Sequence, residues 1–397
     1  MDYQVRPLTA DDIRASRRLG WEAFGVPGSP PTEVPTEFPP GMRPFGAFDG
    51  EILAARMIDR EYDSHFGGTL VPTCGIAGVT TAAEYRGAGL LTPLFRATLH
   101  AARQRGAAIS TLFPTAPRIY RRFGYEMAGD YVTVEVPTTS LAALPAGDTL
   151  LVRRATAGDY DAVRTVYAAW ASAQNGPLTR TGPSFPATAD EFIESFTAVT
   201  VAVDGEGVVH GYVSWDRGQG YGENARLEVA DLIATRPEAT RALLAVLGSF
   251  ASVAPTTRID TSGVDLARLL IPSLHWRVVD SSPYMVRLLD LPSAFGTRRF
   301  APHVEARLPF TLADEFLDEL SGDWLLEVGG GIAQCTRAEG RGVGGPAFDG
   351  RGLALMYAGS QGAANLRMAG LLRGEAGQDP IWDNLFGGRQ FHIRDYF

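Results

Sequence analysis

One short segment combines glycines with an arginine in a pattern suited to holding a phosphate. An apolar stretch over 75–81 predicts a buried strand, which runs into Arg86-Gly87-Ala88-Gly89-Leu90-Leu91 and then a helix through about Arg105. A glycine-rich turn at a helix N-terminus gathers free backbone N–H groups and the positive end of the helix dipole, which suits a pyrophosphate. The third glycine of a Rossmann dinucleotide-binding turn is missing. An ordinary helix-start loop is the alternative interpretation.

A second segment adds a tyrosine to this arrangement. A short apolar strand is predicted over 111–114, and Ile119-Tyr120-Arg121-Arg122-Phe123-Gly124-Tyr125 follows at a predicted helix end. Taken alone, Tyr120 is also interpretable as a packing residue. Together the two segments resemble the GCN5-related N-acetyltransferase (GNAT) superfamily, with an Arg-x-x-Gly-x-(Gly/Ala) loop and a Tyr-x-x-x-Gly-(Phe/Tyr) helix end. Leu91 departs from the last position of the loop pattern.

The departure at Leu91 narrows the resemblance. An Arg-x-x-Gly-Leu-Leu loop, an Ile-Tyr-x-Arg-Phe-Gly-Tyr stretch and a chain of 397 residues ending in phenylalanine are similar to the Eis (enhanced intracellular survival) family. The resemblance implies an α/β (α+β) fold class, with two tandem GNAT-like domains followed by a sterol-carrier-protein-2-like domain. It also implies acetyl-CoA as co-substrate, a small-molecule amine as acceptor, and a homo-hexamer, with a trimer or a dimer as alternatives.

The same resemblance assigns roles to single residues. Tyr120 would protonate the departing CoA thiolate as general acid, and the free carboxylate of Phe397 would accept the proton of the amine. The backbone N–H of Val79 would polarise the thioester carbonyl. The other residues expected to bind acetyl-CoA are Thr81, Arg86, Gly87, Ala88, Gly89, Leu90, Leu91 and Thr115, and those expected to bind the amine are Phe24, Phe113 and Asp395.

The acceptor is less defined than the reaction. The best-known members of the family acetylate aminoglycosides in an acidic pocket, but two positions that carry acids there correspond here to Val26 and Tyr396. A less charged amine is therefore an alternative acceptor. Transfer of a longer acyl chain is a rival reaction, and a lipid or small-ligand carrier using an apolar stretch over 348–372 is a rival from another class. The intact arginine loop and Tyr120 argue against an inactive scaffold.

The chain repeats an opening phrase, which predicts a duplicated α/β domain. Residues 5–12 correspond to residues 152–159, and both phrases predict a short strand and a Thr-x-x-Asp helix start. Asp49-Gly50 and Asp204-Gly205 follow in the same order as turns between apolar strands. We expect a catalytic domain over 1–145, a second domain over 146–290, and a third domain over 291–397 that delivers the terminal carboxylate.

The second copy lacks a phosphate loop. Its corresponding residues are Arg236-Pro237-Glu238-Ala239-Thr240, where proline removes a donor N–H and the glutamate would repel phosphate. One active site per chain is therefore expected. In the third domain we expect a helix from about Leu312 and short strands within 324–334.

Composition argues against several classes of function. All 36 basic residues are arginine, the net charge is −9 and basic runs are absent, which argues against a nucleic-acid partner. The sequence contains neither an 18-residue apolar run nor a signal-peptide pattern, so we expect no membrane span and a cytoplasmic location. Two cysteines and six scattered histidines predict no metal site. Cys74 is expected to pack in the core rather than carry an acyl group.

Overall fold

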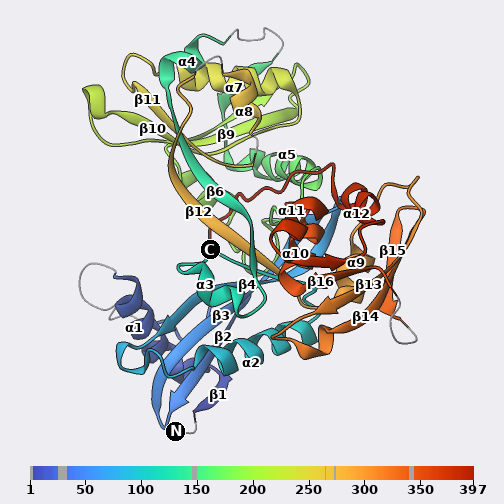
Figure 1. Ribbon diagram of the computed structural model, residues 1–397. Coiled ribbons are helices and arrows are strands. Elements are labelled where there is room, and N and C mark those ends of the chain that lie inside the picture. The colour runs from blue at the N-terminus through green and yellow to red at the C-terminus, as the bar shows by residue number, and fades with distance from the viewer. Residues whose placement is uncertain (1–2, 26–33, 145–149, 264, 272–273, 339–343) are drawn as a thin grey trace.

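The chain forms two β-sheets, one of twelve strands and one of five. The larger sheet runs from the first repeat into the second, and the smaller sheet belongs to the C-terminal part. A computed structural model describes residues 3–25, 34–144, 150–263, 265–271, 274–338 and 344–397. Figure 1 shows the first repeat at the bottom, the second at the top and the C-terminal part beside their junction.

The first repeat places helices on a strongly twisted sheet. Its strands are β1 (Gln4–Pro7), β2 (Met42–Asp49), β3 (Ile52–Phe66), β4 (Thr69–Thr81), β5 (Ile109–Leu112) and β6 (Glu126–Pro137), and its helices are α1 (Ile13–Phe24), α2 (Leu91–Gln104), α3 (Pro117–Arg121) and α4 (Thr138–Ala142). Helix α2 buries Leu94, Phe95 and Leu99, whose spacing places them on one face of the helix. The predicted strand over 75–81 and the predicted helix after the glycine loop are therefore confirmed.

The second repeat follows the order of the first, with one additional short helix between its first helix and its second strand. Its strands are β7 (Leu151–Arg154), β8 (Ala198–Val203), β9 (Val209–Arg217), β10 (Arg226–Ala234), β11 (Thr256–Ser262) and β12 (Arg277–Leu288), and its helices are α5 (Tyr160–Ser172), α6 (Ala189–Glu194), α7 (Pro237–Gly248) and α8 (Leu266–Leu270). Pro237 stands in the first turn of α7, as expected for a residue without an N–H group.

The duplication predicted from residues 5–12 and 152–159 extends to individual side-chain contacts. Arg6 pairs with Asp12 at 2.7 Å, and Arg153 pairs with Asp159 at the same distance. Both aspartates also complete a capping box with the threonine three residues earlier. The two predicted hairpins form as well. The first hairpin turns through two residues after Asp49, whereas the second needs the five residues between β8 and β9.

Strand β12 joins the two repeats. It comes from the second repeat, yet it lies antiparallel between β5 and β6 of the first repeat. Strand β6 in turn pairs with β11, so β6 and β12 form the long crossing ribbons in Figure 1. The first half of the sheet is therefore closed by a strand whose pairing partners are all more than 140 residues distant along the chain. Where the domains divide remains a prediction, and the boundary at 145 lies outside the described residues.

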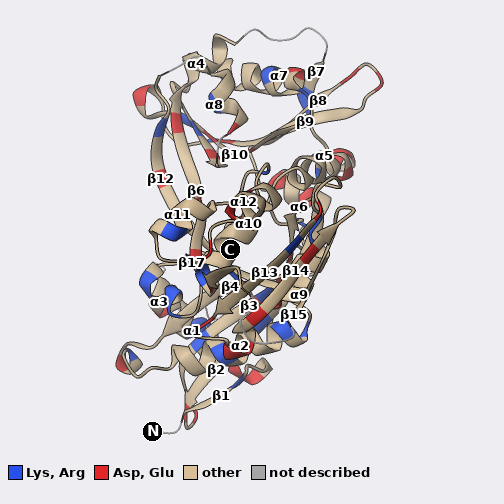
Figure 2. Ribbon diagram, turned by 45° about the vertical axis from the view of Figure 1, so that its right-hand side comes forward, with Lys and Arg blue, Asp and Glu red and all other residues tan. Residues whose placement is uncertain are grey.

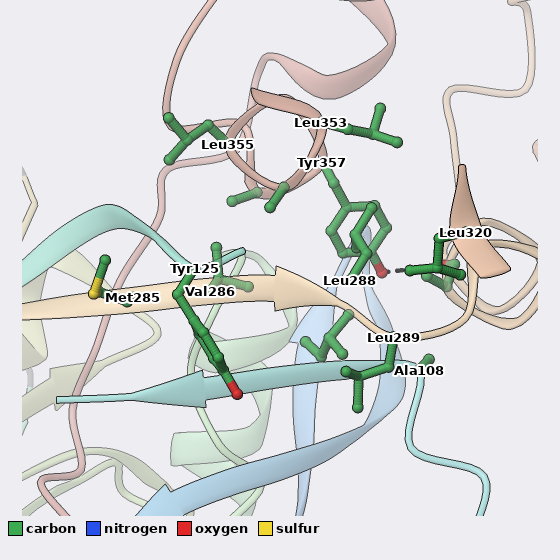
Figure 3. Packing of buried hydrophobic residues seen from close by; sticks show 14 of the residues in the cluster. Ala108, Tyr125, Met285, Val286, Leu288, Leu289, Leu320, Leu353, Leu355 and Tyr357 are labelled. Atoms are coloured by element: carbon green, nitrogen blue, oxygen red, sulfur yellow. Dashed lines mark hydrogen bonds between the residues drawn. The ribbon is translucent and has the colours of Figure 1, made fainter. Parts of the chain in front are cut away.

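A single apolar core runs from the first repeat through the end of β12 into the C-terminal part. Figure 3 shows Val286 and Leu288 of β12, with Leu353, Leu355 and Tyr357 of α10 (Gly350–Ala358) on one side and Tyr125 on the other. All six side chains are at least 95 % buried. Burying a side chain of this size stabilises a fold by about 1.5–3 kcal/mol, so the C-terminal part is firmly packed on the first repeat.

The C-terminal part is a five-stranded sheet covered by short helices. Its strands are β13 (Ala306–Ala313), β14 (Gly322–Gly329), β15 (Ile332–Arg337), β16 (Pro346–Asp349) and β17 (Leu372–Gly374), and its helices are α9 (Leu291–Thr297), α10, α11 (Ala363–Met368) and α12 (Asp379–Phe386). The predicted strands within 324–334 are confirmed as the β14–β15 hairpin. The predicted helix from Leu312 is wrong. Leu312 belongs to β13, where it pairs with Gly322 of β14, and the Asp314 carboxylate then accepts hydrogen bonds from two backbone N–H groups in a tight turn.

A buried ion pair fixes the C-terminal part against the other two. Arg287 of β12 is 1 % exposed, and its Nη2 donates to Asp314 at 2.8 Å. The same guanidinium donates to the backbone oxygen of Phe123, just after α3. A buried charge that loses its partner is costly, because water cannot replace the partner.

We expect Arg287→Leu to lower the free energy of unfolding by about 3–5 kcal/mol, because it leaves the Asp314 carboxylate buried without its cation. The matched control is Arg307→Leu, which breaks the exposed pair between Arg307 and Glu327 at 3.2 Å and should cost less than about 1 kcal/mol. Urea unfolding followed by circular dichroism measures both. Equal midpoints for the two variants would contradict the importance of the buried pair.

Candidate active site

An opening in the sheet lies where β4 and β5 separate. The two strands pair in parallel from Thr73 and Ile109 to Ile76 and Leu112, after which β5 ends and β4 continues. Gly78, with φ of +56°, forms a bulge in β4 together with Val79, because these two residues lie opposite the single residue Met57 of β3. The stretch from Val79 to Thr81 has no strand partner on its β5 side among the described residues. Backbone donors are thus available to an extended ligand inserted into this opening.

The predicted phosphate loop lies at the start of α2. Gly87 and Gly89 have φ of +84° and +77°, which side chains other than glycine rarely adopt. Within the described residues, the amides of Gly87, Gly89, Leu90 and Leu91 have no backbone partner. The segment 86–89 is exposed, and a 14-residue helix begins directly behind it. The loop therefore presents several free donors and a helix dipole to solvent, as an anion site requires.

Tyr120 lies on α3 and packs against α2. Its ring is 5 % exposed and meets the Phe95 ring edge-on at 6.0 Å. Burial raises the pKa of Tyr120, and a hydrogen bond with the Thr115 hydroxyl offsets part of that rise. Tyr120 is therefore a protonated hydroxyl at neutral pH. The structure brings Thr115 and Tyr120 together and places Thr115 itself in an exposed position.

The C-terminal tail, residues 390–397, reaches this region after passing along the second repeat. Asn175 holds it through two backbone hydrogen bonds of 2.8 and 2.9 Å, and the Ile393 N–H donates to the Ser262 hydroxyl at 2.8 Å. These contacts with the second repeat hold the tail in place. Both Figure 1 and Figure 2 show the C-terminus near the middle of the molecule, between the two halves of the long sheet.

The last residue is seated among aromatic rings beside β4. The Phe397 ring lies 4.9 Å from Tyr62, 5.6 Å from Phe113 and 6.1 Å from Tyr284, measured between ring centroids. It also covers Gly75, where an added Cβ would approach it to 2.9 Å. Phe397 is thus held at the point where β4 and β5 begin to separate. Among the described residues, its carboxylate forms no ion pair.

The three residues expected to bind the amine have different surroundings. Phe113 directly follows β5 and contacts both Tyr396 and Phe397, so it borders the opening. Phe24 ends α1 with 55 % of its surface exposed, and the neighbouring Val26 lies outside the described residues. The Asp395 carboxylate accepts hydrogen bonds from Arg180 at 2.7 Å and from the Tyr167 hydroxyl at 3.3 Å, and its contact with the amine stays a prediction.

This buried ionic cluster is the feature that sequence reasoning missed. Arg180 bridges Asp395 of the tail and Asp231 of β10, and Arg394 pairs with the same Asp231 at 3.2 Å. Burial by itself would raise the pKa of the Asp231 carboxyl. The two arginines outweigh this effect and lower that pKa to about 2. Burial raises the pKa of Asp395, and Arg180 compensates in part. The charges of two arginines and two aspartates therefore cancel at the point where the tail is held. These residues are too far apart in the sequence to form a recognisable motif.

Other candidate groups have structural surroundings. Cys74 is fully buried, and burial together with the nearby Asp59 carboxylate raises its pKa well above the usual range, which makes it a poor nucleophile. Across the described ranges, no three side chains of the metal-binding types come together. Of the helices in the described part of the chain, none combines the length and apolar character needed to span a bilayer.

Three family profiles match successive parts of the chain. Residues 4–128 and 176–288 each match a family profile described as an acetyltransferase (GNAT) domain, and residues 291–393 match a sterol carrier protein domain. An uncharacterized N-acetyltransferase of Streptomyces griseus is 27% identical over 360 residues, which cover 85% of each chain. Another, from Streptomyces avermitilis, is 29% identical over 328 residues and 77% of each chain.

Two solved structures share the whole architecture. A GCN5-related N-acetyltransferase from Kribbella flavida has a TM-score of 0.84 at 28% identity, and the match covers 100% of this chain and 98% of that one. Eis1 from Mycobacterium abscessus has a TM-score of 0.77 over the full length of both chains, at 20% identity, which shows a common fold. The chain belongs to the GNAT acetyltransferase superfamily. Its two GNAT domains and terminal sterol carrier domain confirm the predicted fold class and the resemblance to the Eis family.

Gly75 gives a direct test of how the tail is seated. We expect Gly75→Ala to displace the Phe397 and Tyr62 rings, because the new methyl group would lie 2.9 and 2.6 Å from them. Carboxypeptidase A should then release the terminal phenylalanine at least threefold faster than from the unchanged protein. The matched control is Gly205→Ala, whose added methyl group meets open space. Equal release rates for the two variants would show that Gly75 does not set the position of the tail.

Proposed function

We propose that this chain moves an acetyl group from acetyl-CoA to a primary amine by direct attack, with no acyl-enzyme. The observation that carries the proposal is the seating of Phe397 at the separation of β4 and β5. The pyrophosphate of acetyl-CoA would bind the Arg86–Leu91 loop at the start of α2. Its pantetheine arm would follow the unpaired stretch of β4 past Thr81, and the Val79 N–H would polarise the thioester carbonyl.

Two groups would move the protons. The Phe397 ring contacts Phe113, and Thr115, two residues further along, is bonded to Tyr120, so both groups belong to the same end of β5. On this proposal the terminal carboxylate receives the proton of the attacking amine, and Tyr120 protonates the departing thiolate. The absence of an ion pair at the carboxylate, within the described residues, leaves it available for a cationic amine.

The energetics favour a relay over simple proton transfer. A free α-carboxyl with a pKa of about 3.5 would deprotonate an alkyl ammonium with a pKa of about 10 only at a cost of about 9 kcal/mol. A carboxylate among aromatic rings is less hydrated than a free one, which strengthens it as a base, and a water molecule can carry the proton. For Tyr120, donation to a thiolate is uphill by about 2 kcal/mol at unperturbed pKa values, and burial increases this difference. Donation therefore has to coincide with departure of the thiolate.

The second and third domains would support the site rather than duplicate it. In the second GNAT domain Pro237 and Glu238 begin the helix that corresponds to α2, so the domain offers no phosphate loop, while its Arg180 and Asp231 hold the tail. In the sterol carrier domain Trp382 packs against Phe348 and Phe386, with ring centroids 4.9 and 5.8 Å apart. This filled core favours an assembly role over lipid carriage. A homo-hexamer remains a proposal that analytical ultracentrifugation would test.

The reaction itself is tested by thiol release with the full-length protein. We expect acetyl-CoA to support thiol release with at least some members of a panel of primary amines, and myristoyl-CoA to support none. Intersecting initial-velocity lines are expected for direct attack, whereas parallel lines would indicate an acyl-enzyme. Turnover of myristoyl-CoA in place of acetyl-CoA would replace the proposal by longer-chain acyl transfer. Specific binding of a lipid without any thiol release would favour the carrier.

We expect Tyr120→Phe and deletion of Phe397 each to lower kcat at least tenfold while acetyl-CoA still binds. The reason is that each change removes one end of the proton path and leaves the loop at α2 intact. Single-turnover kinetics and calorimetric titration of acetyl-CoA measure the two quantities separately.

A third variant isolates the charge of the terminus from its ring. Adding one alanine after Phe397 keeps the ring but moves the carboxylate by about 3.5 Å, and it should lower kcat as much as the deletion does. Phe397→Leu keeps the carboxylate in place and should retain most of the activity. Full activity of the extended protein would remove the carboxylate from the mechanism.

A further inference from the structure

A cavity of about 480 Å³ lies in the second GNAT domain, and its lining contains none of the residues assigned above to the acetyl-CoA and amine sites. It is bounded by α5, the segment 179–187, α6 and β9. Cavities of about 300–1,000 Å³ with mainly apolar walls are the usual sites for small molecules. The lining consists of Tyr160, Asp161, Val163, Arg164, Thr165, Tyr167, Ala168, Thr179, Arg180, Thr181, Phe185, Ala187, Phe192 and Tyr212.

The polar groups in this lining already have partners. The Thr165 hydroxyl donates to the Asp161 backbone oxygen at 2.8 Å, and the Thr181 hydroxyl donates to Thr179 at 3.0 Å. All three nitrogens of the Arg180 guanidinium donate to protein oxygens. Asp161 and Arg164 complete the charged lining, and these two exposed side chains pair with each other at 3.6 Å. An ion that moved past them into the cavity would lose its water without gaining an unpaired counter-charge. Five aromatic rings and three small apolar side chains remain for contact, so the lining suits an uncharged, apolar or aromatic molecule.

The inner wall of the cavity is also the anchor of the C-terminal tail. The Tyr167 hydroxyl and the Arg180 Nε both bind Asp395, two residues before the terminus. Arg180 has φ of +54°, and it is the sole non-glycine residue with positive φ in the described part of the chain. Its unusual backbone is held by these bonds rather than by local preference. The segment that carries it is therefore sensitive to what fills the space beside it.

A second connection runs through aromatic rings. Phe185, at the rim of the cavity, lies 5.4 Å from Tyr62, and Tyr62 lies 4.9 Å from Phe397. A molecule that packs against Phe185 and Tyr167 would restrict both routes to the tail. The same residues of the second domain therefore line the cavity and hold the C-terminal tail, whose last residue is seated on the first domain.

We propose that this cavity binds a neutral apolar or aromatic small molecule, and that its occupation holds the C-terminal tail in place. Binding and tail restraint stand on the geometry of the second domain alone. Only the effect on turnover rests on the proposed function, since that effect needs the terminal carboxylate to be the base. The occupant would act by decreasing the release of the tail from the first domain.

Binding is tested with Nile red, a neutral dye that carries no nucleophilic amine, added to the full-length protein. We expect a saturable fluorescence increase with the unchanged protein and at least tenfold weaker binding by Ala168→Trp, which fills the cavity from α5. The matched control is Ala169→Trp on the same helix, an exposed neighbour outside the lining, which should bind as the unchanged protein does. Equal affinity of both variants would overturn the assignment of the site, and so would the lack of saturable binding.

Tail restraint is tested by the rate at which carboxypeptidase A releases the terminal phenylalanine. Saturating Nile red should slow release at least threefold in the unchanged protein and in Ala169→Trp, but not in Ala168→Trp. The last variant also controls for direct inhibition of the peptidase by the dye. Unchanged release with dye bound would overturn the coupling between cavity and tail. Neither measurement uses an acyl donor, so failure of the acetyl-transfer proposal would be recognised separately.

Discussion

The backbone hydrogen bonds of β12 are the constraint on which the rest of the molecule depends. By lying between β5 and β6, this strand makes one sheet of two repeats and fixes the distance between them. It also carries Arg287 into contact with Asp314, which sets the sterol carrier domain against both repeats. A tail anchored on one repeat can then reach a defined point on the other. Without β12 the repeats would be two separate sheets, and the position of the terminus would be undetermined.

The duplication has separated two tasks that a single GNAT domain would have to combine. The first copy keeps exposed glycines and free amides at the start of α2, where an anion can approach. The second copy has a proline and a glutamate at the corresponding place, and its sheet presents Asp231 to two arginines instead. Charge at the loop would be screened by water, whereas charge at the buried cluster is balanced within the protein. One copy is therefore suited to binding and the other to holding.

The sequence predicted local features well, because their causes are local. The capping threonines, the hairpin after Asp49 and the glycines before α2 each depend on a few neighbouring residues, and the structure contains them as expected. The prediction of a helix from Leu312 was wrong. The apolar residues Leu312, Phe316 and Leu320 have helical spacing, but pairing with β14 and the turn capped by Asp314 determine the structure of this segment. The partner of Asp395 was beyond prediction, since Arg180 lies 215 residues away and a carboxylate near a terminus has no pattern that names its cation.

The buried arginines carry one more implication. In Arg180, Arg287 and Arg394 the buried cations are all guanidinium groups, and the whole sequence contains no lysine. A guanidinium remains protonated at neutral pH and is a poor nucleophile toward thioesters, whereas a lysine amine would be exposed to slow acylation by any acyl-CoA that the protein meets. Losing one positive charge by such a reaction would unbalance a buried cluster permanently. The buried cations of the scaffold are therefore unreactive toward the donor that its fold family employs.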